Sequence, residues 1–172
     1  VKGGEQMQSA DRIEFLVHTY ADRITRIGYT WFGNVHDAQD VCQTVLLRLM
    51  THDCPDDSPE AERAWVLRVT INVCKDIKRS AWFRRTVGLD EGAALTVELP
   101  EPGDDTVLRA VQSLPLKYRK VIYLHYYEGY AVGEISKLLG LPPNLVSTHL
   151  TRAKRKLRKQ LGGEPNEQTI SG

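Results

Sequence analysis

The chain has 172 residues, 41% of them hydrophobic and 26% charged, which is the composition of an ordinary soluble globular protein of one domain or two small ones. Its net charge of +1 would by itself argue against nucleic-acid binding, because nucleic-acid-binding domains usually carry a basic surface. There is no signal peptide, no apolar run long enough to cross a membrane and no Cys-x-x-Cys pair among the three cysteines, so we expect a protein of the reducing cytoplasm.

The near-zero net charge hides a strong segregation of charge along the chain. Residues 51–62 hold five acids and no Lys or Arg, whereas residues 75–85 hold five bases and one acid. Residues 86–105 hold six acids and no base, and residues 152–159 hold six bases in eight positions. Two basic regions are therefore separated by an acidic stretch, and the net charge is a cancellation.

Apolar residues recur at helical spacing throughout, without a convincing alternating pattern, so we predict an all-α fold. The first predicted helix covers residues 10–32, and its apolar stripe consists of Ile13, Leu16, Val17, Tyr20, Ile24 and Ile27. After a turn at Gly33 and Asn34, a second helix covers residues 37–50, with Asp37 favouring its N-terminus. Its apolar face consists of Val41, Val45, Leu46 and Leu49.

A third helix is predicted over residues 61–81, with Trp65, Val69, Val73 and Ile77 on one stripe. Polar and basic residues lie beside this stripe, and they are Arg68, Asn72, Lys75, Lys78 and Arg79. Together with Trp82 they suit stacking on unpaired bases and contact with a nucleic-acid backbone. Periodicity favours a core position for Trp65 over a stacking position, and leaves Trp82 as the more exposed ring.

Residues 86–104 are rich in Gly, Pro and acids, lack an apolar period and are predicted to be a flexible linker. We therefore expect two small helical domains, residues 10–85 and 105–161, followed by a tail of residues 162–172. The second domain should contain helices over residues 105–113, 116–128, 132–139 and 144–161.

The last two helices, with Gly140-Leu141-Pro142-Pro143 between them, have the layout of a helix-turn-helix. Gly140 suits the positive φ that ends the first helix, and Gly133 is expected to let the two helices approach closely. With Val146, Leu150, Ala153 and Leu157 inward, the outward positions of the last helix are Asn144, Ser147, Thr148, Thr151, Arg152 and Arg155. These groups suit base edges in the major groove, and Lys154, Lys156, Arg158 and Lys159 suit phosphates. The alternative is a solvated basic face at a helix C-terminus.

Three stretches in this order resemble a bacterial RNA polymerase sigma factor of the extracytoplasmic-function (ECF) type. They are DAQDVCQTVLLRL at 37–49, AWVLRVTINVCKDIKR at 64–79, and LPLKYRKVIYL at 114–124 continued by RAKRKL at 152–157. The resemblance implies a dissociable specificity subunit that directs core polymerase to promoters. Part of the family pattern is absent, because Ser147 and His149 stand where the family often has Lys or Arg.

The resemblance also implies partners and roles for the residues named above. The second helix would dock on the clamp helices of the largest polymerase subunit through Asp37, Asp40, Gln43, Leu46, Leu47 and Arg48. The loop from Asp56 to Arg63 together with Asn72 would bind a base flipped from the minus-ten element, and the helix-turn-helix would contact the minus-thirty-five element. Further implied partners are the flap of the second-largest subunit and an anti-sigma factor, often membrane-anchored. For the acidic linker, mimicry of nucleic acid near the RNA exit path and a merely soluble tether stay open.

The alternatives to this hypothesis are a freestanding regulator and an enzyme. A freestanding dimeric regulator with the same helix-turn-helix would leave the basic, aromatic third helix unexplained. An enzyme would need an acid-base or metal constellation, and the carboxylates of residues 53–62 have no Lys or His partner at a useful spacing. The nearest metal-like set, His36, Cys42, His52 and Cys54, lacks the paired spacing of a zinc site, so we expect no catalysis, metal or cofactor.

Overall fold

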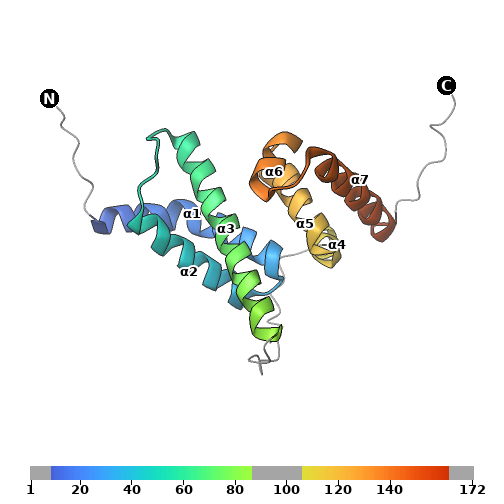
Figure 1. Ribbon diagram of the computed structural model, residues 1–172, viewed down its shortest axis with the longest axis horizontal. Helices are drawn as coiled ribbons and strands as arrows, with labels where there is room; N and C mark the ends of the chain where they lie inside the picture. Colours follow the sequence, from blue (N-terminus) through green and yellow to red (C-terminus); the bar gives the residue numbers. More distant parts are fainter. Residues whose placement is uncertain (1–8, 87–105, 163–172) are drawn as a thin grey trace. The chain divides into compact units, whose positions relative to one another are not determined.

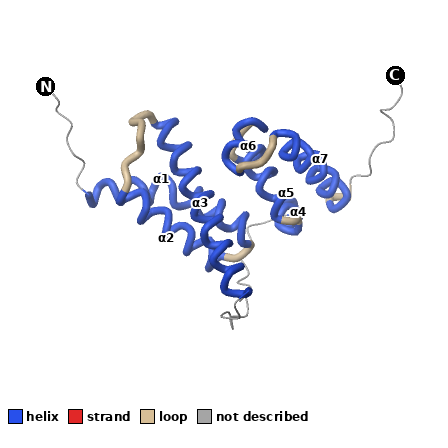
Figure 2. The backbone as a smooth tube through the Cα atoms, in the orientation of Figure 1, coloured by secondary structure: helices blue, strands red, loops and turns tan. Residues whose placement is uncertain are grey.

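A computed structural model describes residues 9–86 and 106–162, which form two compact helical units divided between residues 99 and 100 (Figure 1). None of the described residues forms a strand, as Figure 2 shows, so the predicted all-α fold is confirmed. No helix in these ranges is long and apolar enough to span a lipid bilayer. Apart from Thr86, the predicted linker lies outside the described residues, as does nearly all of the predicted tail.

The first unit consists of α1 (Ser9–Phe32), α2 (Val35–Thr51) and α3 (Pro59–Thr86). Helices α1 and α2 are antiparallel and close, since an added Cβ at Gly28 would lie 3.0 Å from the Cα of Ala38. The second helix begins two residues before the predicted start. Asn34 is its N-cap, because the Asn34 side chain accepts a 2.8 Å hydrogen bond from the backbone N–H of Asp37.

The core of this unit agrees only in part with the predicted stripes. Leu16, Tyr20, Ile24 and Ile27 are buried, but Ile13 is 37% exposed and Val17 is 45% exposed, so their predicted core positions were wrong. Ile13 precedes Leu16, the first buried residue of α1, and Val17 lies at the edge of the stripe, about 60° around the helix from Tyr20. The buried face of α1 is therefore shorter and narrower than the apolar stripe.

In α3 the buried face lies to one side of the predicted stripe. Its fully buried residues are Val66, Leu67, Thr70, Ile71, Val73 and Cys74. Of the predicted stripe only Val73 is fully buried, and Trp65, Val69 and Ile77 are half-buried. The reason is that each four-residue step advances about 40° around a helix, so four such positions run obliquely across it. Trp65 is thus at the edge of the core.

The second unit contains α4 (Thr106–Ser113), α5 (Leu116–Ile122), a π-helical turn η1 (Tyr123–Tyr127), α6 (Val132–Leu139) and α7 (Pro143–Gln160). The predicted helix over 116–128 is therefore divided, with its last turn widened into η1. Buried side chains of α5, η1, α6 and α7 form the core, among them Val121, Leu124, Ile135, Val146 and Leu150. Gly129, with a φ of 75°, follows η1.

Candidate nucleic-acid interface

Helices α6 and α7 form the predicted helix-turn-helix. Gly140 ends α6 in the left-handed region with a φ of 67°, and Pro143 occupies the first turn of α7. The backbone N–H of Leu141 donates to the carbonyl of Ser136 at 3.1 Å, and this hydrogen bond closes the turn. Gly133 does not serve helix approach as predicted, because an ideal Cβ there would have no neighbour within 4 Å.

The outward face of α7 presents short polar groups followed by arginines. Asn144, Ser147, Thr151, Arg152 and Arg155 are exposed, and Thr148 is half-buried. Predicted inward residues Val146, Leu150 and Ala153 are buried, and Leu157 is half-buried. The Thr151 hydroxyl donates to the carbonyl of Ser147 at 3.0 Å, so its oxygen remains available as a hydrogen-bond acceptor.

His149 differs from its neighbours because it faces the core. It is only 8% exposed, and its ring meets that of Tyr118 edge to face at 5.5 Å. Among the described residues, Nδ1 of His149 has no hydrogen-bond partner. Burial, with smaller contributions from Lys117, Arg152 and Lys120, lowers the pKa of His149 below 6.5. A neutral ring inside the unit therefore stands where the family often has the cation of a Lys or Arg.

Helix α3 carries the second set of candidate residues on the face opposite its core. Arg68, Asn72, Lys78 and Arg79 are exposed and Lys75 is half-buried. At about 100° per residue, Arg68, Asn72, Lys75 and Arg79 fall within roughly 60° of one another, while Lys78 lies to one side. Half-buried Trp65 borders this face. The side chain of Trp82 lies outside the described residues.

The candidate docking residues of α2 occupy two faces. Asp40, Gln43 and Leu47 share the exposed side of the helix, with Leu47 55% exposed, whereas Asp37 and Leu46 are half-buried. Arg48 points to α3, where its Nη2 lies 3.3 Å from Oδ2 of Asp76. An ion pair thus joins the candidate docking helix to the helix with the basic face, a link that sequence spacing did not reveal.

The four residues of the predicted metal-like set are not grouped in the described part of the chain. His36, Asp37 and Asp40 come together instead, with Nδ1 of His36 3.6 Å from Oδ2 of Asp40. They are at the N-terminus of α2, where the helix dipole disfavours a cation, so we interpret them as surface polar contacts.

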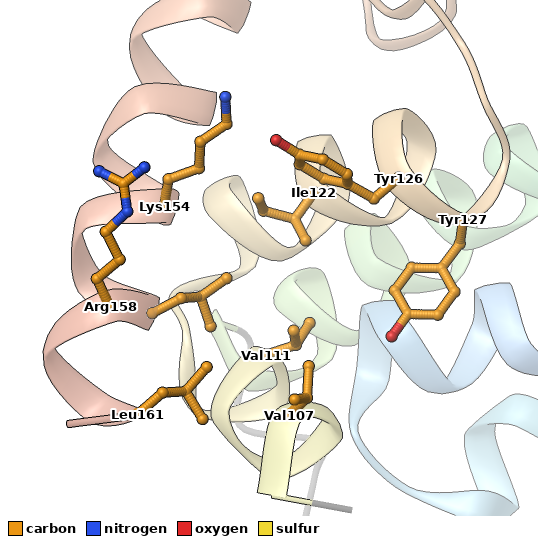
Figure 3. A pocket seen from close by; sticks show the side chains of 9 residues that line it. Val107, Val111, Ile122, Tyr126, Tyr127, Lys154, Arg158 and Leu161 are labelled. Atoms are coloured by element: carbon orange, nitrogen blue, oxygen red, sulfur yellow. The ribbon is translucent and has the colours of Figure 1, made fainter. Parts of the chain in front are cut away.

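A groove of about 550 Å³ lies within the second unit and was not anticipated from the sequence (Figure 3). Its lining residues are Val107, Val111, Ile122, Tyr126, Tyr127, Lys154, Leu157, Arg158 and Leu161. Apolar and aromatic side chains form one side, with Val107, Tyr126 and Tyr127 more than half exposed, while Lys154 and Arg158 project from α7 (Figure 3). The Lys154 ammonium lies 5.8 Å from the Tyr126 ring centre. The chemistry favours an apolar occupant with acidic groups at its edge.

Comparisons with known proteins agree on one family. The family described as Sigma-70 region 2 matches residues 16–84, and Sigma-70, region 4 matches residues 104–157. The chain is 30% identical over 177 aligned positions to the ECF RNA polymerase sigma factor SigW of Bacillus subtilis strain 168, covering 94% of this chain and 92% of that protein. It is 32% identical over 149 positions to the ECF RNA polymerase sigma factor SigL of Mycobacterium tuberculosis strain H37Rv, covering 83% and 80%.

A solved structure shares the fold. It is the sigma factor RpoE in complex with the anti-sigma factor NepR from Bartonella quintana, with a TM-score of 0.67 at 13% identity over 90% of this chain and 99% of that one.

Proposed function

The chain belongs to the ECF RNA polymerase sigma factors, which direct core polymerase to specific promoters, and we propose that its two helical units divide promoter recognition between them. Helix α7 would contact the minus-thirty-five element and α3 the minus-ten element. Membership of this family favours a polymerase subunit over the freestanding dimeric regulator. In this role the polymerase performs the chemistry, and the sigma factor supplies position and strand opening in the bacterial cytoplasm.

The observation that carries this proposal is the composition of the exposed face of α7. Ser147 and Thr151 lie near its N-terminal half, where a recognition helix meets base edges, and Arg152 and Arg155 follow on the same face. Arginine can make two hydrogen bonds to guanine, whereas Lys156 and Lys159 suit phosphates and carry no sequence information. The turn, the buried stripe and the polar face all agree with a helix in the major groove.

For the minus-ten element we propose that the loop before α3 works together with the basic face of α3. Arg68, Lys75 and Arg79 would follow the backbone of an opened strand, and Asn72 with residues 56–63 would bind one extruded base. Only residues 56–58 lie in the loop, because α3 begins at Pro59 and the predicted loop up to Arg63 is helical in its second part. Asp56, Asp57, Glu60 and Arg63 are exposed, which leaves their polar groups accessible to a nucleotide.

Two surfaces are proposed for polymerase. The exposed side of α2, with Asp40, Gln43 and Leu47, would dock on the clamp helices of the largest subunit, because Leu47 and Met50 together expose apolar surface beside these polar residues. The groove of Figure 3 would take an apolar segment of the flap of the second-largest subunit. An anti-sigma factor, membrane-anchored or not, would cover the same surfaces, a proposal supported by the RpoE–NepR complex of similar fold.

Reconstituted transcription with core polymerase tests the division of labour. We expect Arg152→Ala to lower transcription mainly from promoters that keep the natural minus-thirty-five sequence, with Lys156→Ala as a control that weakens all promoters uniformly. We expect Arg79→Ala to slow strand opening on duplex templates, with recovery on templates that are already unpaired around the minus-ten element. Equal defects of Arg79→Ala on paired and unpaired templates would argue against the proposed role of α3.

A further inference from the structure

Two residues of α1 hold one carboxylate at the start of α3. Nη2 of Arg12 lies 2.8 Å from Oε2 of Glu62, and the hydroxyl of Tyr20 donates to Oε1 of Glu62, also at 2.8 Å. Both carboxylate oxygens are thus engaged by partners 50 and 42 residues away in the sequence. The contact is partly shielded, since the side chain of Glu62 is 17% exposed and Tyr20 is buried.

A series of hydrogen bonds between residues near in sequence continues from Glu62 into the loop that precedes α3. The backbone N–H of Glu62 donates to the carbonyl of Ser58 at 3.0 Å, and the N–H of Ala61 donates to the Ser58 hydroxyl at 3.2 Å. The N–H of Ser58 in turn donates to Oδ1 of Asp56 at 3.1 Å. Asp56 is thereby connected to α1 through Ser58 and Glu62.

At its other end the loop is held by His52, whose backbone N–H donates to the carbonyl of Arg48 at 3.0 Å and whose Nδ1 lies 3.1 Å from the same oxygen. Of residues 52–58 only Cys54 and Ser58 are half-buried, and the others are exposed. A loop with few buried apolar contacts depends on its hydrogen bonds for a fixed conformation. The contacts of Glu62 with α1 therefore supply restraint at the α3 end of the loop that the core does not.

The two donors to Glu62 keep their protons over the physiological pH range. Burial, together with the hydrogen bond to Glu62, raises the pKa of Tyr20 to about 12, so its hydroxyl stays a donor. Arginine stays protonated in proteins.

We propose that Arg12 and Tyr20 are positioning residues for promoter discrimination, which act through Glu62 to fix the loop of residues 52–58 against α1 and α3. This inference rests on the proposed binding of an extruded minus-ten base by that loop. A pocket discriminates among bases only if its polar groups stay in place, because a loosened pocket can adapt to the wrong base. Loss of the restraint should therefore lower the preference for the cognate base more than it lowers overall activity.

Arg12 and Tyr20 belong to α1 and stand outside the candidate DNA contacts. Glu62 is one of residues 56–63, but at 100° per residue it lies roughly 80° to 120° around α3 from Asn72 and Arg68. A change in base preference caused by Tyr20→Phe or Arg12→Met would therefore come from the position of the loop, whereas Glu62→Gln reports on that position and on any direct contact together.

The test uses the full chain with core polymerase and a set of promoters that carry each of the four bases in turn at every minus-ten position. Open-complex formation gives a specificity ratio, cognate over substituted, for each position. We expect Glu62→Gln and Tyr20→Phe to lower this ratio about three- to tenfold at one position, as expected for the loss of one or two ordinary hydrogen bonds. Arg12→Lys, which keeps the charge, should retain more of the ratio than Arg12→Met.

Ile27→Val is the matched control, because Ile27 is a core residue of α1 that has no part in the contacts of Glu62. It should lower the Tm by an amount similar to that of Tyr20→Phe without changing the specificity ratio. If Glu62→Gln and Tyr20→Phe lower the Tm and leave every ratio unchanged, the contact is structural only and the proposal is wrong. Wild-type ratios near one at all positions would instead refute the role of the loop itself.

Discussion

Replacement of glycine by alanine should change the stability of the second unit in opposite directions at two positions seven residues apart. Gly140 ends α6 in the left-handed region with a φ of 67°, whereas Gly133 lies within α6. An added methyl group has space at both positions, since nothing lies within 4 Å of an ideal Cβ. The two substitutions therefore differ in backbone conformation and not in packing.

The expected magnitudes follow from this difference. A non-glycine residue in the left-handed region costs about 1–2 kcal/mol, so Gly140→Ala should destabilise the unit by that amount. Glycine in the middle of a helix is about 0.5–1 kcal/mol less favourable than alanine, so Gly133→Ala, in the first turn of α6, should stabilise the unit by part of this amount. For a unit of this size, 1 kcal/mol corresponds to about 4–8 °C in Tm, and the two variants should differ by at least about 4 °C.

The shift in Tm is measured by thermal unfolding of the full chain, monitored by circular dichroism. Hydrogen exchange then shows whether the change in stability lies in α6 and α7. Gly28→Ala is a control for the first unit, because its new Cβ would lie 3.0 Å from Cα of Ala38 and 3.2 Å from Cβ of Val41. It should destabilise α1 and α2 while exchange in α6 and α7 stays unchanged. A loss of stability for Gly133→Ala equal to that for Gly140→Ala would refute the backbone argument.

Three further predictions concern the candidate DNA-binding face of α7, the candidate docking face of α2 and the buried His149. Arg152→Ala should weaken promoter use about 5- to 100-fold if the side chain makes a bidentate base contact, while a pull-down still recovers core polymerase; loss of core recovery would mean that the docking surface is wrongly assigned. Leu47→Asp should reduce core capture about tenfold without a change in Tm, because Leu47 is 55% exposed; an unchanged affinity would remove the outer side of α2 from the docking surface. The pKa of His149 is lowered in the fold, so the unfolded chain takes up a proton more readily, and the second unit should lose stability as pH falls below 6.5; His149→Phe should abolish this dependence, and its persistence in that variant would point to another group.

The helix-turn-helix was predictable because its determinants are local. A positive-φ glycine at 140, the proline that follows it and a four-residue apolar period each act within one or two turns of the chain. Neighbouring residues therefore carried enough information to predict α6 and α7, including the outward face of α7.

What the sequence did not predict depends on which helices meet. Ile13 and Val17 continue a regular apolar stripe, yet they are exposed because the buried face of α1 begins at Leu16 and is narrower than the stripe. Arg48 and Asp76 are separated by 28 residues, so their pairing required the observed contact between α2 and α3. The groove beside Tyr126 likewise needs α4, η1 and α7 together. The spacing of apolar residues predicts which face of a helix is buried, but it does not predict how much of that face the neighbouring helix covers.

Helix α7 serves two surfaces of the second unit with one rigid element. Arg152 and Arg155 face outward on the side proposed to bind DNA, while Lys154 and Arg158 line the groove from the same turns. An acidic occupant that neutralises these two groove cations would leave fewer cations free to displace counterions from DNA. Occupation of the groove would then make promoter binding less steeply dependent on salt concentration, by about one to two in the logarithmic slope. Because both surfaces belong to α7, promoter binding by the polymerase-bound sigma factor would depend less on the ionic strength of the cell than promoter binding by the free sigma factor.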